Sequence, residues 1–232
     1  MPRLDLADIA AEQWGLITTA QAEAAGSSRK AVGRLARSGM LERLAHGVYR
    51  LTGAPSDPRD DLRAAWLALD PGRTAGDRLR DELPEVVSHR SAAALHELGD
   101  LDADRHEFTV AGRRQTRRTD VRFHKATLPA NDWGIVLGLP CTTVIRTIAD
   151  LAADRTDGGH LAGVVRDALT VRHVDVDHLA QALTPYAARY GANAGDGESL
   201  LIRFLEEAGV PEATRRTIEL AAGGRAAADG VR

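Results

Sequence analysis

The chain has 232 residues, a formal net charge of −3 and 44 % hydrophobic residues, which are typical values for a folded globular protein. Its single cysteine, Cys141, excludes an intrachain disulfide and favours a reducing, cytoplasmic location. No apolar run approaches about 18 residues, and the acidic N-terminus is unlike a signal peptide. We therefore expect a cytoplasmic protein without a membrane span.

The N-terminal segment predicts a helix, a short second helix and a turn. Apolar residues recur at helical spacing up to Trp14, and residues 16–17 form a short apolar stretch. Thr18 and Gln21 have the spacing of a capping box, in which two backbone donors are satisfied reciprocally. Gly26 ends this second helix. Small residues in the second helix and its turn allow two helices to cross closely.

A third helix follows, and it is amphipathic and basic. Ser27 or Ser28 caps it, and it runs to about Ser38. Its apolar and basic side chains lie on opposite faces when residues are spaced by about 100°. Two short strands with a turn at residues 46–47 come next, and both carry basic residues. This order of elements predicts a winged helix-turn-helix.

The basic helix and hairpin are typical of a surface that contacts DNA. Serines at a helix N-terminus suit phosphate, arginine or lysine on the exposed face suits base edges, and the hairpin suits the DNA backbone or minor groove. The alternative is that these charges only solvate an exposed face. The residues predicted to contact DNA are Thr18, Thr19, Ser27, Ser28, Arg29, Lys30, Arg34, Arg37, Arg43, His46 and Arg50.

Composition and periodicity predict an α+β protein in three parts. A winged helix-turn-helix domain covers residues 1–53, a linker rich in small residues and proline covers 54–60, and a mixed α/β domain covers 61–232. In this second domain, strands are expected at 106–110 and 121–124.

The segment between those two strands is a second basic stretch, which carries Arg113, Arg114, Arg117 and Arg118. It is interpreted either as a solvated hairpin loop or as a surface for DNA, RNA or an acidic partner. A strand pair is expected about Gly138, and the part that follows is helical, with helices at about 160–172, 177–190 and 197–208.

No motif predicts a catalytic site, a metal site or a cofactor. The histidines do not form a zinc-binding spacing, no paired cysteine motif occurs, and no phosphate-binding loop is present. Cys141 is interpreted as a small core residue, and Ser91 as a helix cap. His89 and His96 are interpreted as half-buried residues with ordinary hydrogen bonds.

Several segments resemble AbiEi-type antitoxins. LITTAQA and GMLERLAHGVYRL resemble the N-terminal domain of that family, and VVSHRSAA and GLP, followed by TIADLA, resemble its α/β part. The resemblance covers roughly residues 4–155. These segments are residues 16–22, 39–51, 86–93, 138–140 and 147–152.

The resemblance implies an antitoxin rather than an enzyme. Such proteins bind inverted repeats in double-stranded DNA upstream of their own operon, repress it, and counteract a nucleotidyltransferase-like toxin, with the antitoxic activity in the second domain. Winged-helix modules commonly act in pairs on palindromes, so a dimer on DNA is a further hypothesis, although no coiled-coil seam is visible. Two alternatives stay open: a nuclease-like enzyme with a winged-helix specificity module, and a regulator with a ligand-sensing second domain.

Overall fold

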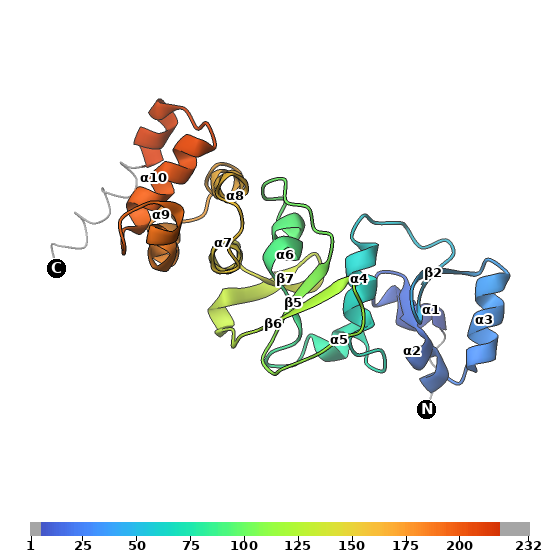
Figure 1. The fold of residues 1–232 in the computed structure, drawn as a ribbon. Coiled ribbons are helices and arrows are strands. Elements are labelled where there is room, and N and C mark those ends of the chain that lie inside the picture. The colour runs from blue at the N-terminus through green and yellow to red at the C-terminus, as the bar shows by residue number, and fades with distance from the viewer. Residues whose placement is uncertain (1–5, 219–232) are drawn as a thin grey trace, which may run out of the picture. The chain divides into compact units, whose positions relative to one another are not determined.

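The computed structural model describes residues 6–218, and the chain divides into two compact units. The N-terminal unit is Met1–Glu85 and the C-terminal unit is Val86–Arg232 (Figure 1). Each unit has its own sheet, so the α+β fold class is confirmed. Within the described range, no helix has the length and apolar character that crossing a bilayer requires.

The N-terminal unit begins with the predicted winged helix-turn-helix. Thr18 and Gln21 form the expected capping box, and Ser28 caps the basic helix. Val32 of that helix and Ile17 of the sheet belong to one buried core. The elements are α1 (Leu6–Ala11), β1 (Leu16–Thr18), α2 (Thr19–Ala24), α3 (Arg29–Arg37), β2 (Leu41–Ala45) and β3 (Val48–Leu51), with antiparallel strands in the order β1-β3-β2.

Two further helices, α4 (Asp60–Leu67) and α5 (Ala75–Arg78), belong to the same unit. A buried polar network connects the winged helix to the segment that carries α5. Gln13 and Gln21 hydrogen-bond to each other through their side chains. The Gln21 amide donates to the carbonyl of Arg73 at 2.8 Å, and the Ala75 backbone amide donates to Gln13 at 3.1 Å. The buried side-chain amides of Gln13 and Gln21 therefore obtain hydrogen-bond partners from residues well beyond β3.

Aromatic and cationic side chains extend this connection. The rings of Trp14 and Trp66 meet edge to face with centroids 6.3 Å apart, and the Arg78 guanidinium lies 3.6 Å from the centroid of Trp66. The Trp66 indole then donates to the carbonyl of Glu85 at 2.7 Å. The compact unit thus continues to Glu85, whereas the sequence suggested a boundary in the linker at 54–60.

The C-terminal unit contains a five-stranded mixed sheet in the order β6-β5-β4-β8-β7. The expected strand pair about Gly138 is present as an antiparallel hairpin. Leu137 and Gly138 have φ values of 50° and 85°, which both central residues of a type I′ turn require. The strands are β4 (Val86–Val87), β5 (His106–Val110), β6 (Val121–Lys125), β7 (Trp133–Val136) and β8 (Leu139–Thr142).

The strands β5 and β6 occur where they were predicted, but they are parallel. The basic segment between them is therefore a crossover loop and not the hairpin loop that the sequence suggested. Parallel strands start at the same end of the sheet, so the chain must return along the full strand length. Residues 111–120 make this return without a helix.

The helical part expected near the C-terminus is confirmed. Ile148, Leu161 and Phe204 are buried in one apolar cluster of the unit. The helix expected at 177–190 is α9 followed by a 3-10 helix, η2. The elements are α6 (His89–Leu95), η1 (Ala130–Asp132), α7 (Val144–Ala153), α8 (Gly158–Thr170), α9 (Val176–Leu183), η2 (Thr184–Tyr190) and α10 (Gly197–Glu207).

Ser91 does not cap a helix, because α6 already begins at His89. Its hydroxyl instead donates to the carbonyl of Arg105 at 3.1 Å and accepts the backbone amide of Glu107 at 2.9 Å. The interpretation of Ser91 as a cap is therefore wrong, and its side chain joins α6 to the start of β5.

Candidate nucleic-acid interface

The α3 helix separates its apolar and basic side chains as predicted. Val32 is 1 % exposed, and Leu35 packs partly buried against the same core. Lys30, Arg34 and Arg37 are exposed on the other face. Lys30 and Arg34 have no ion-pair partner within the described part of the chain. Their charges are therefore available to an external ligand.

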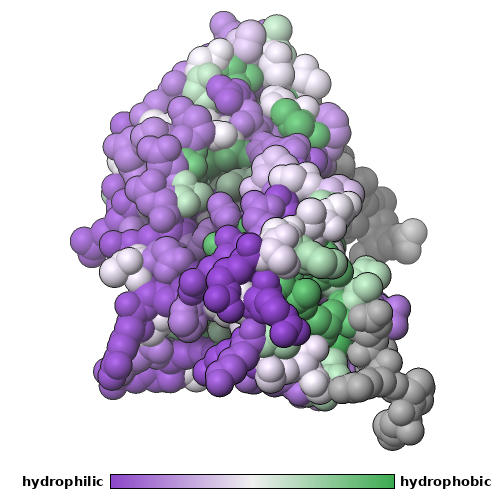
Figure 2. All heavy atoms as spheres, turned by 90° about the vertical axis from the view of Figure 1, so that its right-hand side faces the viewer, coloured by the Kyte–Doolittle hydropathy of each residue, from purple (hydrophilic) through white to green (hydrophobic). Residues whose placement is uncertain are grey.

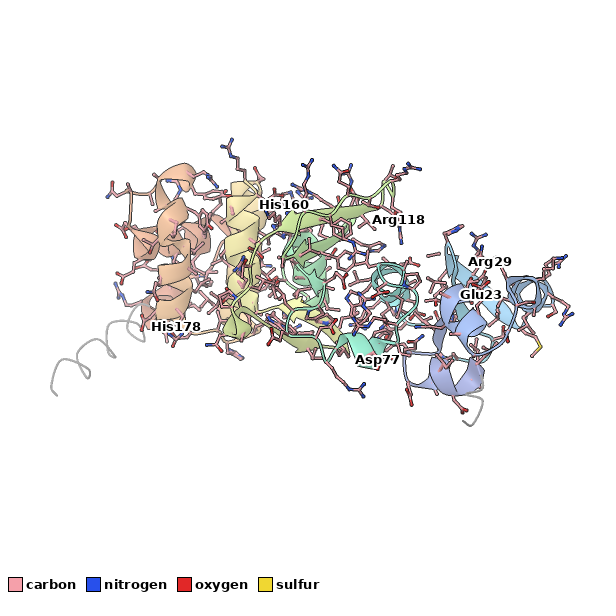
Figure 3. The ribbon with its side chains drawn as sticks, turned by 90° about the horizontal axis from the view of Figure 1, so that it is seen from below. Glu23, Arg29, Asp77, Arg118, His160 and His178 are labelled. Carbon is pink, nitrogen blue, oxygen red and sulfur yellow. The ribbon has the colours of Figure 1, made fainter. Side chains whose placement is uncertain are left out.

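The N-terminus of α3 presents polar groups on the same surface. The Ser28 hydroxyl accepts the backbone amide of Ala31 at 3.2 Å, and Ser27 is half-buried beside it. Arg29 forms an ion pair with Glu23 of α2 at 3.4 Å, and the two labelled side chains lie close together in Figure 3. The Arg29 side chain is 80 % exposed, so this pair is weak and can give way to a phosphate.

The wing, formed by β2, β3 and their turn, carries two exposed basic side chains. A guanidinium nitrogen of Arg43 lies 3.2 Å from Nδ1 of His46, and Arg43 Nε donates to the carbonyl of Ala45 at 3.3 Å. The Arg37 side chain is also held by a hydrogen bond to the backbone, since its Nε donates to the carbonyl of Gly33 at 3.2 Å. Figure 2 views the N-terminal unit from the side that carries α3, where the surface is mostly hydrophilic.

Two predicted contact residues have internal roles instead. Thr18 is fully buried, and its hydroxyl donates to the carbonyl of Pro71 at 2.5 Å. The Arg50 side chain is 13 % exposed and lies between Glu42 at 2.5 Å and Asp60 at 2.8 Å. The hydrogen bond to Glu42 raises the pKa of Arg50 above its ordinary value.

These two residues therefore stabilise the unit, and we no longer count them among the candidate DNA-contacting residues. Thr19 lies at the edge of the candidate DNA-contacting surface, because it is half-buried and its hydroxyl lies 3.4 Å from the carbonyl of Gly47.

The second basic stretch lies in the C-terminal unit, on the crossover loop between β5 and β6. Arg113 and Arg117 are exposed, whereas Arg118, labelled in Figure 3, is paired with Asp120 at 2.5 Å. The Arg114 guanidinium lies 5.2 Å from the ring centroid of Phe123. Arg118 and Arg114 therefore have partners in the loop and in β6, whereas Arg113 and Arg117 have no ion-pair partner among residues 6–218.

The sequence did not reveal a buried polar cluster in the same unit. Glu107 on β5 is 4 % exposed, and its carboxylate lies 3.3 Å from Nε2 of His124 on β6. The His124 ring stacks on His89 with centroids 3.4 Å apart. Arg122 approaches Glu107 at 3.4 Å and makes a bidentate pair with Asp154 at 2.8 and 2.9 Å.

Burial and interaction shift two pKa values in this cluster. Desolvation lowers the pKa of His89 to about 3, and the charge of His124 adds to this effect. The pKa of Glu107 is lowered as well, because hydrogen bonds from His124 and the Arg90 amide outweigh the opposing effect of burial. Pairing of Glu107 with Arg122 across parallel strands requires the register of the sheet, and sequence spacing does not supply it.

Other candidate groups are structural. Cys141 is fully buried, which raises the pKa of its thiol, and this fits the predicted role as a small core residue. Nε2 of His96 lies 2.7 Å from the carbonyl of Thr142, an ordinary hydrogen bond as expected. Among residues 6–218, no three His, Cys, Asp or Glu side chains gather as a metal ion would require.

Comparisons with known proteins address the N-terminal unit and the fold. Residues 5–52 match the family model AbiEi_4, described as a transcriptional regulator and AbiEi antitoxin, which confirms the resemblance for this segment. The curated proteins contain no match to the chain. The structure titled crystal structure of the RV2827C protein from Mycobacterium tuberculosis aligns with a TM-score of 0.50 at 18 % identity, over 91 % of this chain and 78 % of that chain. At this identity, the likeness indicates a shared fold.

Proposed function

We propose that this protein is a sequence-specific DNA-binding antitoxin that represses its own toxin–antitoxin operon and is not an enzyme. The observation that carries the proposal is the exposed basic face of α3 beside the basic wing, in the segment that matches AbiEi transcriptional regulators. A helix of this size fits the major groove of B-DNA, and a hairpin beside it reaches the neighbouring backbone.

The proposed contacts divide by chemistry. Lys30 and Arg34 contact base edges, because both are exposed on α3 and neither has an ion-pair partner among residues 6–218. Ser27, Ser28 and Arg29 contact phosphate at the positive end of the helix dipole. Those three positions, together with Arg37, Arg43 and His46, set the orientation of the protein on the duplex but do not read sequence.

The C-terminal unit carries the proposed antitoxic activity towards a nucleotidyltransferase-like toxin in the cytoplasm. The exposed Arg113 and Arg117 on the crossover loop give the C-terminal unit a second nucleic-acid surface of its own in this proposal. An inverted-repeat operator would be bound by two copies, since each winged helix reads one half-site.

The test is an anisotropy titration of the protein against its own upstream region and against a scrambled duplex, at two salt concentrations. We expect selective binding to the upstream region and a slope of log K on log salt of roughly −4 to −6, because about five or six phosphates would be neutralised. Equal, weak binding to both duplexes would overturn the proposal.

The antitoxin part of the proposal predicts a nucleotidyltransferase-like reading frame beside this gene, and it is tested by expressing that reading frame with and without this chain. We expect the nucleotidyltransferase-like protein to inhibit growth when it is expressed alone, and co-expression of this chain to restore growth. Operator binding without rescue of growth would support the proposed repressor function and contradict the proposed antitoxin function.

A further inference from the structure

Two large apolar side chains are exposed in the same hairpin of the C-terminal unit. Ile135 on β7 is 54 % exposed, and Leu137, in the turn that leads to β8, is 50 % exposed. The other exposed large apolar residues of the described chain, Met40 and Val171, lie elsewhere. β7 is also an end strand of the five-stranded sheet (Figure 1). Exposed apolar surface and an open strand edge therefore occur together, at a place that the proposed DNA contacts do not use.

The backbone of β7 has hydrogen-bonding groups that point away from the sheet. In an antiparallel ladder, residue pairs that exchange two backbone bonds alternate with pairs that exchange none. Ile135 lies opposite Pro140, which has no N–H, so this pair is of the second kind. The alternation assigns the bonds with β8 to Gly134 and Val136. The N–H and C=O of Ile135 therefore face the open edge, and among residues 6–218 they make no backbone bond outside the hairpin.

The two edges of the sheet differ in charge. β6, at the other end of the sheet, exposes Arg122 and Lys125. A second copy added antiparallel to β6 would bring these cations together, and such charges are a common means of preventing edge-to-edge pairing. The residues of β7, Trp133–Val136, include no charged side chain. The β7 edge thus lacks the charges that protect the β6 edge.

We propose that β7 pairs antiparallel with β7 of a second copy of this chain, about a twofold axis at Ile135. A neutral strand is complementary to itself in this arrangement, because the outward N–H and C=O of Ile135 meet the C=O and N–H of Ile135 of the second copy. The two isoleucine side chains then lie side by side across the axis. The second copy is the favoured occupant, because it supplies the same open edge and the same apolar side chain.

The pairing requires no DNA, so this proposal does not rest on the proposed repressor function. A dimer joined in this way carries two winged helices, which is the number that an inverted repeat requires. Because β7 has only four residues, the interface is small, and we expect a reversible dimer rather than a permanent one. Sedimentation equilibrium of the full chain, from about 10 μM to about 1 mM, should show the average mass rising from monomer towards dimer.

A cysteine substitution tests the position of the axis. Ile135→Cys places two thiols opposite each other with Cα atoms about 5.5 Å apart, within the range of a disulfide. Val171→Cys is the matched control, because Val171 is 57 % exposed and lies outside the hairpin, and the native Cys141 is fully buried in both variants. Under mild oxidation, Ile135→Cys should form a disulfide-linked dimer at least about tenfold faster than Val171→Cys, since the pairing raises the effective concentration of the thiols.

A charge substitution tests the open edge itself. Ile135→Lys places like charges opposite each other and removes the apolar contact, so it should raise the Kd of the dimer by about fivefold or more. Val171→Lys adds the same charge at a similarly exposed position and should leave the Kd unchanged. Circular dichroism confirms that each variant is folded.

The proposal is overturned if the chain stays monomeric up to about 1 mM, or if Ile135→Cys forms the linked dimer no faster than Val171→Cys. A dimer that tolerates Ile135→Lys as well as it tolerates Val171→Lys would also overturn it, because the interface would then lie elsewhere.

Discussion

Arginine has different roles in the N-terminal unit, and the surroundings of each side chain decide which. Arg34 is exposed on α3 without an ion-pair partner in the described residues. Arg50 is fixed between Glu42 and Asp60, and Arg78, which is 1 % exposed, lies on the ring of Trp66. A guanidinium that is already satisfied gains little from phosphate, so the exposed side chains remain the candidates for DNA contact.

Arg34→Ala is expected to weaken operator binding and relax base preference, because a bidentate contact to guanine contributes about 1–3 kcal/mol of discrimination. Arg43→Ala should weaken binding to all duplexes about equally and reduce the salt slope by about 1. Arg80→Ala is the control, since its side chain is 78 % exposed but lies outside α3 and the wing. Anisotropy with operator and scrambled duplexes measures all three, and unchanged affinity of both test variants would refute the assigned surface.

His89 should make the C-terminal unit sensitive to acid. Its pKa is about 3 in the folded chain and near 6.5 in the unfolded chain, so between these values only the unfolded chain binds the proton. Stability should therefore decrease as pH falls below about 6.5, by up to about 2 kcal/mol at pH 5. His89→Asn removes this titration, and asparagine tolerates the φ of 52° at this position.

Urea unfolding at pH 7 and pH 5 compares the two proteins. We expect the difference in stability between the two pH values to be smaller for His89→Asn than for the unchanged chain. Equal pH dependence would show that His89 does not remain neutral when the chain is folded.

At the level of elements, close approach of the backbone explains one glycine in the helical part. A Cβ atom on Gly197, the first residue of α10, would lie 2.0 Å from the carbonyl oxygen of Ala180 on α9. At Gly163 within α8, apart from its chain neighbours and the backbone of its own helix, no atom of the described residues lies within 4 Å of the Cβ position. The same residue type is therefore required at one helix contact and replaceable in another helix.

Gly197→Ala is expected to destabilise the chain by about 1–3 kcal/mol, because α9 and α10 must separate to admit the methyl group. Gly163→Ala should be neutral or stabilising by up to about 1 kcal/mol, since alanine favours helix. Urea denaturation of both variants provides the comparison. A Gly197→Ala protein as stable as the Gly163→Ala protein would contradict the close packing of α9 and α10.

At the level of the whole molecule, the winged helix depends on the segment that follows it. Gln13 and Gln21 bond to the backbone at residues 73 and 75, and Trp14 packs against Trp66. A fragment that ends at residue 53 would leave these buried groups without partners and expose the rings.

We therefore expect a fragment of residues 1–85 to fold and bind operator DNA, and a fragment of residues 1–53 to fail to fold. The physical reason is that only the longer fragment keeps the buried amide network and the tryptophan contact. Dispersion of amide signals in NMR spectra separates the two outcomes. A well-dispersed spectrum from residues 1–53 would show that the following segment is dispensable.

Local patterns were sufficient to predict much of this protein. Helical periodicity, the capping box at Thr18 and Gln21 and the basic face of α3 follow from residues a few positions apart. The winged helix-turn-helix, the strands β5 and β6 and the hairpin at Gly138 were therefore predictable. Most of the candidate DNA surface was predictable for the same reason, because exposure on an amphipathic helix depends on local spacing.

Only the tertiary structure decided which polar residues are internal. Thr18 bonds to Pro71, and Arg50 bonds to Asp60. Both partners lie beyond the winged helix-turn-helix in the sequence, and these contacts make Thr18 and Arg50 internal although their neighbours are on the surface. The parallel direction of β5 and β6 and the cluster at Glu107 likewise arise from contacts distant in sequence. Periodicity reports which face of an element is buried, but hydrogen bonding and ion pairing depend on what the fold places against that face.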